Sequence, residues 1–387
     1  MAKTTWTLTD QRHGLDVAHW TLDPSAIGTG GGYSVTKRTL TAGRSRGMDV
    51  VEVDNGRLRF ALLPTRGMGL WRAACGSLQL GWRAPVAGPV HPSLVPLAQP
   101  DGLGWLAGFD ELMCRCGLES NGAPEFAPDG RLVHGLHGRI ANLPAHHLEV
   151  TTDQDAGEIV VRGVVDESHL FGNKLRLEAT VTTRLGEPRL TIADRITNLS
   201  AEPGELQLLY HINFGSPLLT PGARVRLPFE RLAPRDAVAQ EDVPTWDTYG
   251  PETPGSVESV FFARPAADAD GNTLAVLGAA SGEEGAAVRF NIDQLPLFAL
   301  WKNRQAAADG YVTGLEPAVN LPNPKSFEKQ HGRVIVLQPG ETRQFAVTIE
   351  ALPDAEAVQR AADEVAAIQG DRPSEVLDRP DPDWSAT

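Results

Sequence analysis

One carboxylate in this sequence stands in surroundings that suit proton transfer. Glu316 lies between Leu315 and Pro317 in the apolar, glycine-bearing run 310–317. If its side chain points into the protein, it must be paired, protonated or poised to move a proton, because an unpaired buried charge is costly. If it points outward, it is an ordinary surface glutamate, which is the commoner case. Both positions stay open for Glu316 at this point, and only the buried one makes it a candidate general base.

Two histidines and an arginine are interspersed with two glycines in the segment 133–139. His134 and His137 are followed by Arg139, with glycines at positions 135 and 138. Glycine lets a backbone approach a ligand closely, so this segment suits a loop or strand end at a binding site. The alternative is a turn with solvent-exposed imidazoles. We interpret His134, His137 and Arg139 as candidate ligand-binding residues.

A third histidine ends a strand-like apolar run. His211 follows the run 208–210, and Asn213 shares its face if the strand continues. A histidine in this place is often only a hydrogen-bonded core residue. Both a role at a site and a structural role are therefore open for His211.

An aromatic residue ends another strand-like run. Trp301 is followed by Lys302 and Asn303. An aromatic ring can stack on the CH face of a pyranose while polar neighbours bind its hydroxyls. Trp301 and Lys302 are therefore candidate sugar-binding residues, and a core position for Trp301 is the alternative.

The histidines also allow a metal site. His134, His137, His211 and Glu316 together offer nitrogen and carboxylate ligands. The spacing His-x-x-His occurs often by chance, so the main interpretation has no metal.

The elements that position these residues are predicted to be antiparallel strands. Apolar and polar residues alternate in short runs between turn residues, at 51–53, 58–62, 159–165, 174–181, 189–192, 206–210, 334–337 and 344–349. Runs of period two are typical of strands, and no strand–helix–strand rhythm appears. The sequence predicts an all-β protein with few helices and one large antiparallel domain over residues 1–352. A C-terminal helix at 353–370 and a surface tail at 371–387 are expected to follow.

Composition excludes several classes of function. The formal net charge of -14 argues against a nucleic-acid partner, which needs Lys and Arg against phosphates. No uncharged apolar run is long enough to span a bilayer, and the amino terminus lacks the apolar core of a signal peptide, so we expect a cytoplasmic protein. The three cysteines suggest neither a disulfide scaffold nor a structural zinc site. Phosphate-binding glycine loops and the Gly-x-Ser-x-Gly elbow are missing from the sequence.

Read in order, several short motifs resemble the aldose 1-epimerase (galactose mutarotase-like) superfamily, and a divergent branch of it in particular. They span roughly residues 45 to 350 and comprise Leu63–Met68 with Leu78–Trp82, Phe109–Leu118, His134–Arg139, Ile196–Ser200, Tyr210–Phe214 and Leu315–Pro317. The order of these motifs is more informative than any one of them.

The resemblance implies a β-supersandwich with an open cleft across one sheet. It implies that Glu316 acts as the base on the C1 hydroxyl of a sugar and His211 as the acid on the ring oxygen, from opposite sides of the ring. His137 matches the second histidine of the family, which helps hold the ring oxygen. Arg66 or Arg139 would bind sugar hydroxyls, and Asp247 is a candidate hydroxyl acceptor. The resemblance implies no cofactor and no metal.

Three functions follow as hypotheses. The first is a cofactor-free aldose 1-epimerase acting on a hexose or related monosaccharide. The second is a metal-dependent sugar isomerase, epimerase or lyase that uses His134, His137, His211 and Glu316 as ligands. The third is a non-catalytic carbohydrate-binding domain. In each case the partner is a small carbohydrate, and the protein is expected to be a monomer or homodimer.

Overall fold

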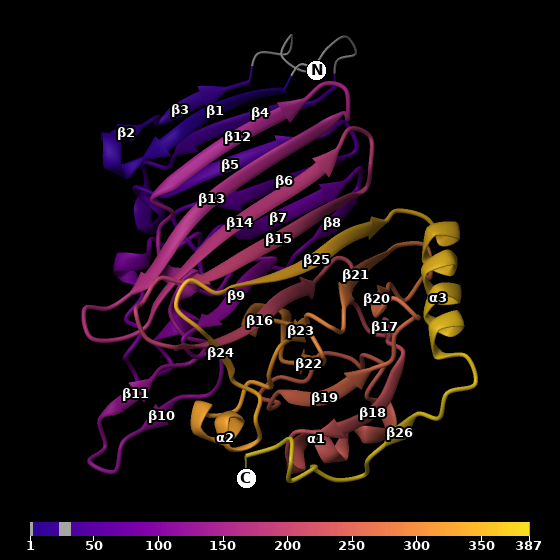
Figure 1. Cartoon of the computed structure of the whole chain (residues 1–387). Coiled ribbons are helices and arrows are strands. Elements are labelled where there is room, and N and C mark those ends of the chain that lie inside the picture. The colour runs from indigo at the N-terminus through magenta and orange to yellow at the C-terminus, as the bar shows by residue number, and fades with distance from the viewer. Residues whose placement is uncertain (1–2, 23–31, 387) are drawn as a thin grey trace.

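Two large antiparallel sheets form most of the protein (Figure 1). The structure is a computed structural model that describes residues 3–22 and 32–386. The first sheet has 10 strands in the order β17 (Arg224–Arg226), β20 (Asn272–Gly278), β21 (Gly285–Asn291), β25 (Thr342–Leu352), β15 (Arg189–Asn198), β14 (Lys174–Arg184), β13 (Glu158–Ser168), β12 (His147–Asp153), β1 (Lys3–Asp10) and β2 (Leu15–Asp16).

The second sheet has 14 strands. Its main path runs through β26 (Glu375–Val376), β18 (Phe229–Pro234), β19 (Ser259–Pro265), β22 (Leu297–Asn303), β23 (Val312–Ala318), β16 (Gly204–Gly215), β9 (Met113–Leu118), β7 (Gly69–Cys75), β6 (Leu58–Leu63), β5 (Asp49–Asp54), β4 (Ser34–Thr39) and β3 (His19–Thr21). Off this path, β8 (Leu78–Leu80) pairs with β7 and β24 (Ile335–Leu337) with β16. A separate hairpin joins β10 (Glu125–Phe126) and β11 (Leu132–His134).

Helices are short apart from one near the C-terminus. The α-helices are α1 (Ala237–Glu241), α2 (Lys325–Gln330) and α3 (Ala355–Gln369). Single 3-10 turns lie at Gln11–His13, Gly43–Ser45, Pro92–Leu94, Gly104–Gly108, Ile140–Asn142, Val243–Thr245 and Ala307–Asp309. None of the helices in the described ranges is long and apolar enough to cross a bilayer. The prediction of a large antiparallel β fold with few helices and a C-terminal helix is confirmed.

The two sheets differ in how their strands are buried, and this difference locates the site. On β14, buried residues alternate with partly exposed ones, as expected for a sheet with one face toward solvent. On β16 and β23 nearly every residue is buried, so both faces of the sheet are covered there. One face packs into the core between the sheets, and loops cover the other.

A buried ion pair joins the two sheets. Arg115 on β9 donates to both carboxylate oxygens of Asp194 on β15, at 2.6 and 2.8 Å. Its remaining donor reaches the backbone carbonyls of Gly67 and Met68, and the hydroxyl of Tyr210 also donates to Asp194. Both charged side chains are fully buried, so each needs the opposite charge of the other to offset the free-energy cost of leaving water.

We expect Asp194→Leu to lower the free energy of unfolding by about 3–5 kcal/mol, because Arg115 would be left as an unpaired buried charge. The change in the midpoint of urea unfolding would measure this effect. Asp166→Leu, which breaks the half-exposed pair with Arg176, is the control and should cost no more than about 1 kcal/mol. A similar loss in the two variants would contradict the assignment of Arg115–Asp194 as a critical link.

The C-terminal segment packs on the sheets. The side chain of Asp354 caps α3 by accepting from the backbone N–H of Ala357. One face of α3 packs on β20 and β21 (Figure 1). Within the segment predicted as a surface tail, β26 pairs with β18, and Trp384 is buried against the outer face of the second sheet. The division of the chain at residues 352 and 370 stays a prediction.

Candidate active site

The middle strands of the second sheet carry the candidate residues on their outer face. The register pairs Asn213 of β16 with Gly314 of β23, and Ile212 with Leu315. Ile212 and Leu315 point into the core between the sheets. Side chains alternate along a strand, so His211 and Glu316 share the opposite face. Neighbouring residues on this outer face, from β9, β16 and β23, form a separate apolar cluster.

A cavity of about 310 Å³ lies over these strands. Glu316 and His211 form part of its surface, and loops and neighbouring strands supply the rest. The lining residues are Leu103, Trp105, Leu106, Phe109, Ala123, Pro124, Leu136, His137, His211, Arg235, Glu258, Val260, Trp301, Glu316 and Pro322. The volume is at the lower end of the range for ligand pockets.

Glu316 points into this cavity and is nearly inaccessible, with 2% of its surface exposed. Its Oε1 atom lies 3.2 Å from Nε2 of His211 but has no hydrogen-bond partner. Burial raises the pKa of Glu316 well above its ordinary value, and the nearby charge of Glu258 raises it further. The carboxyl group therefore favours its protonated form.

His211 is held in one tautomer by Asn213. The amide nitrogen of Asn213 donates to the backbone carbonyls of Glu111 and His211, at 3.0 and 3.2 Å. The amide oxygen consequently faces Nδ1 of His211 at 2.6 Å, and Nδ1 must be the donor. Burial, and next the neighbouring His137, lower the pKa of His211 well below its ordinary value. The neutral ring therefore presents a lone pair at Nε2 toward Glu316.

His137 is held in the same tautomer as His211, with its ring proton on Nδ1. Its Nδ1 donates to the backbone carbonyl of Asn121 at 2.9 Å, which leaves Nε2 as an acceptor. Burial lowers its pKa. Its backbone has φ of 57°, a left-handed conformation that non-glycine residues rarely adopt outside functional or tightly constrained places. The rings of His137 and His211 lie 5.4 Å apart, edge to face.

Aromatic side chains pack around the histidines. Trp105 and Phe109 contact His211 with ring centroids 6.1 and 5.0 Å away, and Trp301 lies 5.3 Å from it. The indole N–H of Trp301 donates to Glu258 at 2.7 Å, and Arg235 donates to the other oxygen of Glu258 at 3.1 Å. The indole N–H of Trp105 is buried without a partner. The pocket thus holds unpartnered polar atoms on Glu316 and Trp105.

Sequence reasoning did not single out four of these residues, Trp105, Phe109, Arg235 and Glu258. Phe109 begins the motif 109–118 that carries the family resemblance, and Trp105 stands four residues before it. That spacing was an available signal for an aromatic pair. Nothing in the local sequence marks Arg235 or Glu258, which reach the pocket only through the pairing of β18 and β19.

The other predicted residues lie elsewhere. His134 and Arg139 line a second pocket of about 280 Å³ together with Glu167 and His169. Arg66 is fully buried, where it donates to Glu111 at 2.5 Å and to Asn142 at 2.7 Å. A ligand-binding role for His134, Arg139 and Arg66 stays a prediction.

Lys302 and Asp247 are also away from the pocket. Lys302 points to the inner face of β22 and donates to the backbone carbonyls of Thr245, Trp246 and Thr248. Asp247 lies within 3.8 Å of Arg224 near the surface. Of the predicted residues, the pocket brings together Glu316, His211, His137 and Trp301, with Asn213 behind His211.

The four side chains proposed as metal ligands do not converge, because His134 lies in the second pocket. Across residues 3–22 and 32–386, no group of three or more His, Cys, Asp and Glu side chains is arranged to hold a metal ion.

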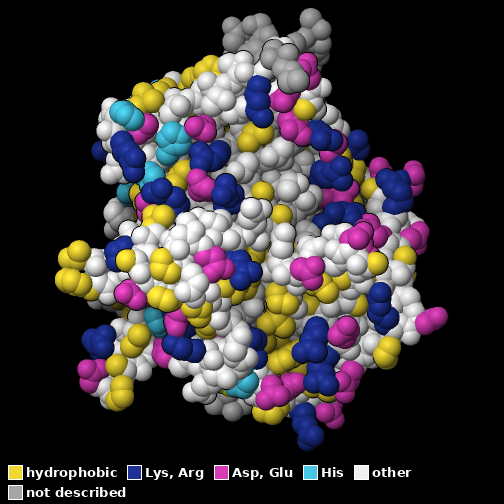
Figure 2. All heavy atoms as spheres, in the orientation of Figure 1, with side chains coloured by type: hydrophobic (Ala, Val, Ile, Leu, Met, Phe, Trp, Pro, Cys, Tyr) yellow, Lys and Arg dark blue, Asp and Glu magenta, His cyan; other side chains and the backbone are white. Residues whose placement is uncertain are grey.

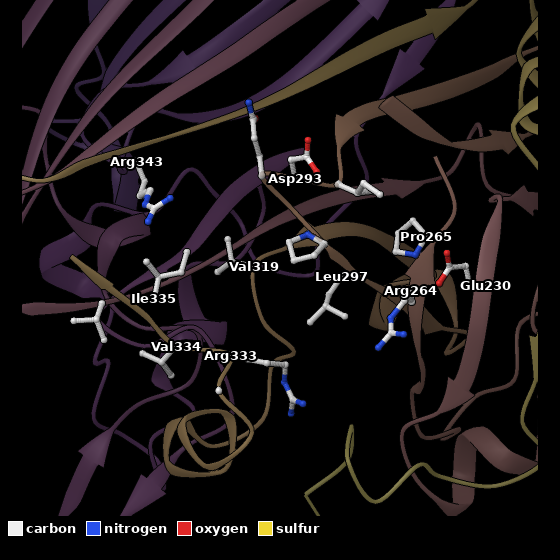
Figure 3. Close-up of a pocket in the computed structure, with 15 residues that line it drawn as sticks. Glu230, Arg264, Pro265, Asp293, Leu297, Val319, Arg333, Val334, Ile335 and Arg343 are labelled. Carbon is white, nitrogen blue, oxygen red and sulfur yellow. The ribbon is translucent and has the colours of Figure 1, made fainter. Parts of the chain in front are cut away.

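A larger cavity, of about 640 Å³, lies between the two sheets near β24. Figure 3 shows its labelled side chains, with apolar Leu297, Val319 and Ile335 in the middle and Arg264, Arg333 and Arg343 around them. It contains none of the predicted site residues and neither histidine nor cysteine. On size alone it would come first, but its carboxylates, Glu230 and Asp293, face no imidazole. We therefore place the candidate chemistry in the smaller pocket.

The architecture and the position of the pocket define a galactose mutarotase-like fold. A galactose mutarotase-like protein of Clostridium acetobutylicum matches with a TM-score of 0.55 at 14% identity, over 82% of this chain and 98% of that one. An Escherichia coli K12 protein provisionally named an aldose 1-epimerase matches with a TM-score of 0.51 at 15% identity, over 79% and 99%. At these identities the likeness concerns the fold alone.

The chain belongs to the family described as "Domain of unknown function (DUF4432)", which it matches over residues 45–351. A Klebsiella pneumoniae protein, provisionally named an aldose 1-epimerase, is 35% identical and has a TM-score of 0.94, over 98% of this chain and 99% of that one. No match was found among curated proteins. The resemblance to the aldose 1-epimerase superfamily is confirmed at the level of fold and relatives.

Proposed function

We propose that this protein is a cofactor-free aldose 1-epimerase, in which Glu316 and His211 act together on the two oxygens of an anomeric carbon. The observation that carries the proposal is the 3.2 Å contact between Oε1 of Glu316 and Nε2 of His211, both buried, in a pocket lined by aromatic side chains. The pKa directions favour a protonated carboxyl beside a neutral imidazole. One acid and one base, already in the right states, therefore stand side by side.

This geometry suits a hemiacetal, because O1 and the ring oxygen O5 are bonded to the same carbon. Nε2 of His211 accepts the proton of the O1 hydroxyl while the carboxyl of Glu316 donates its proton to O5. The C1–O5 bond breaks, and C1 and O1 form the aldehyde. The site is left with an imidazolium and a carboxylate in contact, a pair that the Coulomb attraction stabilises in a dry pocket.

The return half of the reaction restores both groups. After rotation about the C1–C2 bond, O5 attacks the other face of the aldehyde and gives its proton to the carboxylate of Glu316. Protonated His211 returns its proton to O1, and the opposite anomer is formed. Protons and bonds balance over the cycle. Each residue serves once as acid and once as base.

The starting roles differ from those that the family resemblance implies. There, Glu316 is the base and His211 the acid, on opposite sides of the ring. The 3.2 Å contact supports an arrangement with both groups on one side, and the pKa directions support Glu316 as the first proton donor. His137, with its free Nε2, would accept a hydrogen bond from a sugar hydroxyl. Trp301 and Phe109 would stack on the sugar's CH groups.

The test is anomer exchange measured by NMR magnetisation transfer on a panel of aldoses, with and without a metal chelator. We expect exchange above the buffer background that is unaffected by the chelator. Loss of exchange with the chelator would favour the metal-dependent alternative. Sugar binding without exchange would favour a non-catalytic binding domain.

The pH dependence provides a second measurement. His211 has its pKa lowered well below the ordinary value, so it stays neutral where an ordinary histidine would gain a proton. We therefore expect kcat/KM not to fall with decreasing pH near pH 6.5, where an ordinary histidine would gain a proton. The acid limb of the profile, where His211 takes up a second ring proton, lies at lower pH. The alkaline limb marks the loss of the proton from Glu316, whose pKa is raised. A rise in activity with a midpoint near pH 6.5 would contradict these protonation states.

A further inference from the structure

The walls of the pocket carry few hydrogen-bonding side chains. Apart from Glu316, His211 and His137, most of the lining is aliphatic or aromatic. The aliphatic side chains come from loops, from the 3-10 turn Gly104–Gly108 and from β19, and they are Leu103, Leu106, Ala123, Pro124, Leu136, Val260 and Pro322. Leu103 and Leu106 are 39% and 48% exposed, although leucines are ordinarily buried where they can be.

The remaining polar side chains of the pocket are largely occupied by one another. Arg235 donates to Asp236 at 2.8 Å and to Glu258 at 3.1 Å. Glu258 uses its other oxygen to accept from Trp301. The indole N–H of Trp105 is buried without a partner, and it can donate but not accept.

An ordinary hexopyranose carries several hydroxyls besides the anomeric one, and each needs a partner once it leaves water. A wall of Leu, Val and Pro side chains provides none. Contact between this wall and a methyl group lowers the free energy of binding, because apolar surface of both the protein and the sugar is removed from water. A sugar with fewer hydroxyls therefore fits the pocket better than a fully hydroxylated one.

We propose that the pocket selects a deoxy aldose whose carbon chain ends in a methyl group, a 6-deoxyhexose, over the corresponding hexose. This inference rests on the proposed function for the reaction, but it concerns recognition and makes its own prediction about binding. The methyl group would lie against the aliphatic wall, and the hydroxyls that remain would meet His137 and Trp105.

The experiment compares matched sugars that differ only at C6, namely fucose with galactose and rhamnose with mannose. Anomer exchange gives kcat/KM for each sugar, and calorimetry on the Glu316→Gln protein gives its affinity without turnover. We expect the deoxy member of at least one pair to be favoured on the order of 10- to 100-fold in both measurements. Equal values, or a preference for the hydroxylated member in both pairs, would overturn the inference.

A substitution in the wall sharpens the test. Val260→Thr keeps the shape of the side chain and adds a hydroxyl to the pocket, so the preference should narrow by roughly 3- to 10-fold. Val336→Thr, at a 49% exposed position in the larger cavity, is the matched control and should leave the preference unchanged. An unchanged preference in Val260→Thr would contradict the role of the wall.

The two proposals fail in different ways. Preferential binding of the deoxy sugars without any anomer exchange would overturn the proposed function and uphold the selectivity. Exchange of all four sugars at equal kcat/KM would uphold the proposed function and overturn the selectivity. An absence of both exchange and binding for all four sugars would overturn both.

Discussion

Glu316→Gln is expected to lower kcat for anomer exchange by about 10²- to 10⁴-fold, the usual contribution of a positioned acid–base group. Glutamine has nearly the same size and can fill the same space, but it has no acidic proton to give to the ring oxygen. Oε1 of Glu316 lies 3.2 Å from Nε2 of His211, so the substitution removes the acid of the acid–base pair and leaves His211 in place. NMR exchange rates at saturating sugar would measure it.

The matched control is Glu230→Gln, a carboxylate at the rim of the larger cavity. Its kcat should stay within about twofold of the parent, and the circular dichroism of both variants should match the parent. Full activity in Glu316→Gln would show that Glu316 is not the proton donor. Unfolding of Glu316→Gln alone would move the test to His211→Gln, which removes the other half of the pair.

Gly314→Ala is expected to lower kcat by about 10²-fold, although the residue carries no chemistry. Gly314 stands two positions before Glu316 on the same face of β23, and the carboxyl group lies over it. A Cβ atom at position 314 would be 2.1 Å from Oε1 of Glu316, well inside contact distance. The carboxyl group must then move, and misplacement of a reacting group by about 1 Å costs roughly 10²-fold.

Gly278→Ala on β20 tests whether any strand glycine would show the same effect. The nearest atom to a Cβ there is 3.3 Å away, at the flexible end of Arg226, so the change should be tolerated. Its kcat should equal that of the parent. Normal activity of Gly314→Ala would mean that Glu316 has a second productive position, and a crystal structure of the variant would reveal it.

Much of the fold was predictable from local patterns. Period-two runs such as 174–181 and 344–349 fall within β14 and β25, because a half-buried strand needs an apolar residue at every second position. The helix after Asp354 was predictable from its alanines and its cap. The packing of the last residues on the second sheet was not predictable, because Trp384 is buried by strands that are distant in the sequence.

The candidate site was predictable only in part. The motif order pointed to Glu316, His211 and His137, and the structure brings these three into one pocket. His134, three positions before His137, lines a different pocket because the chain between them passes along the wall that separates the two. Spacing along a loop does not determine which side chains converge, since that depends on how the loop folds over the sheet.

The type of fold was predictable from the sequence alone, because hydrophobic periodicity is a local property. The order of the short motifs made Glu316 a candidate, but whether its side chain is buried was left open. The structure buries Glu316 and places it in the wall of the candidate pocket. Three properties of the pocket were not predictable from the sequence: the contact of Glu316 with His211, the tautomer that Asn213 imposes on that histidine, and the aliphatic side chains of the wall. These properties depend on strand register and on burial between distant segments, and burial is what shifts the two pKa values toward a protonated acid beside a neutral base.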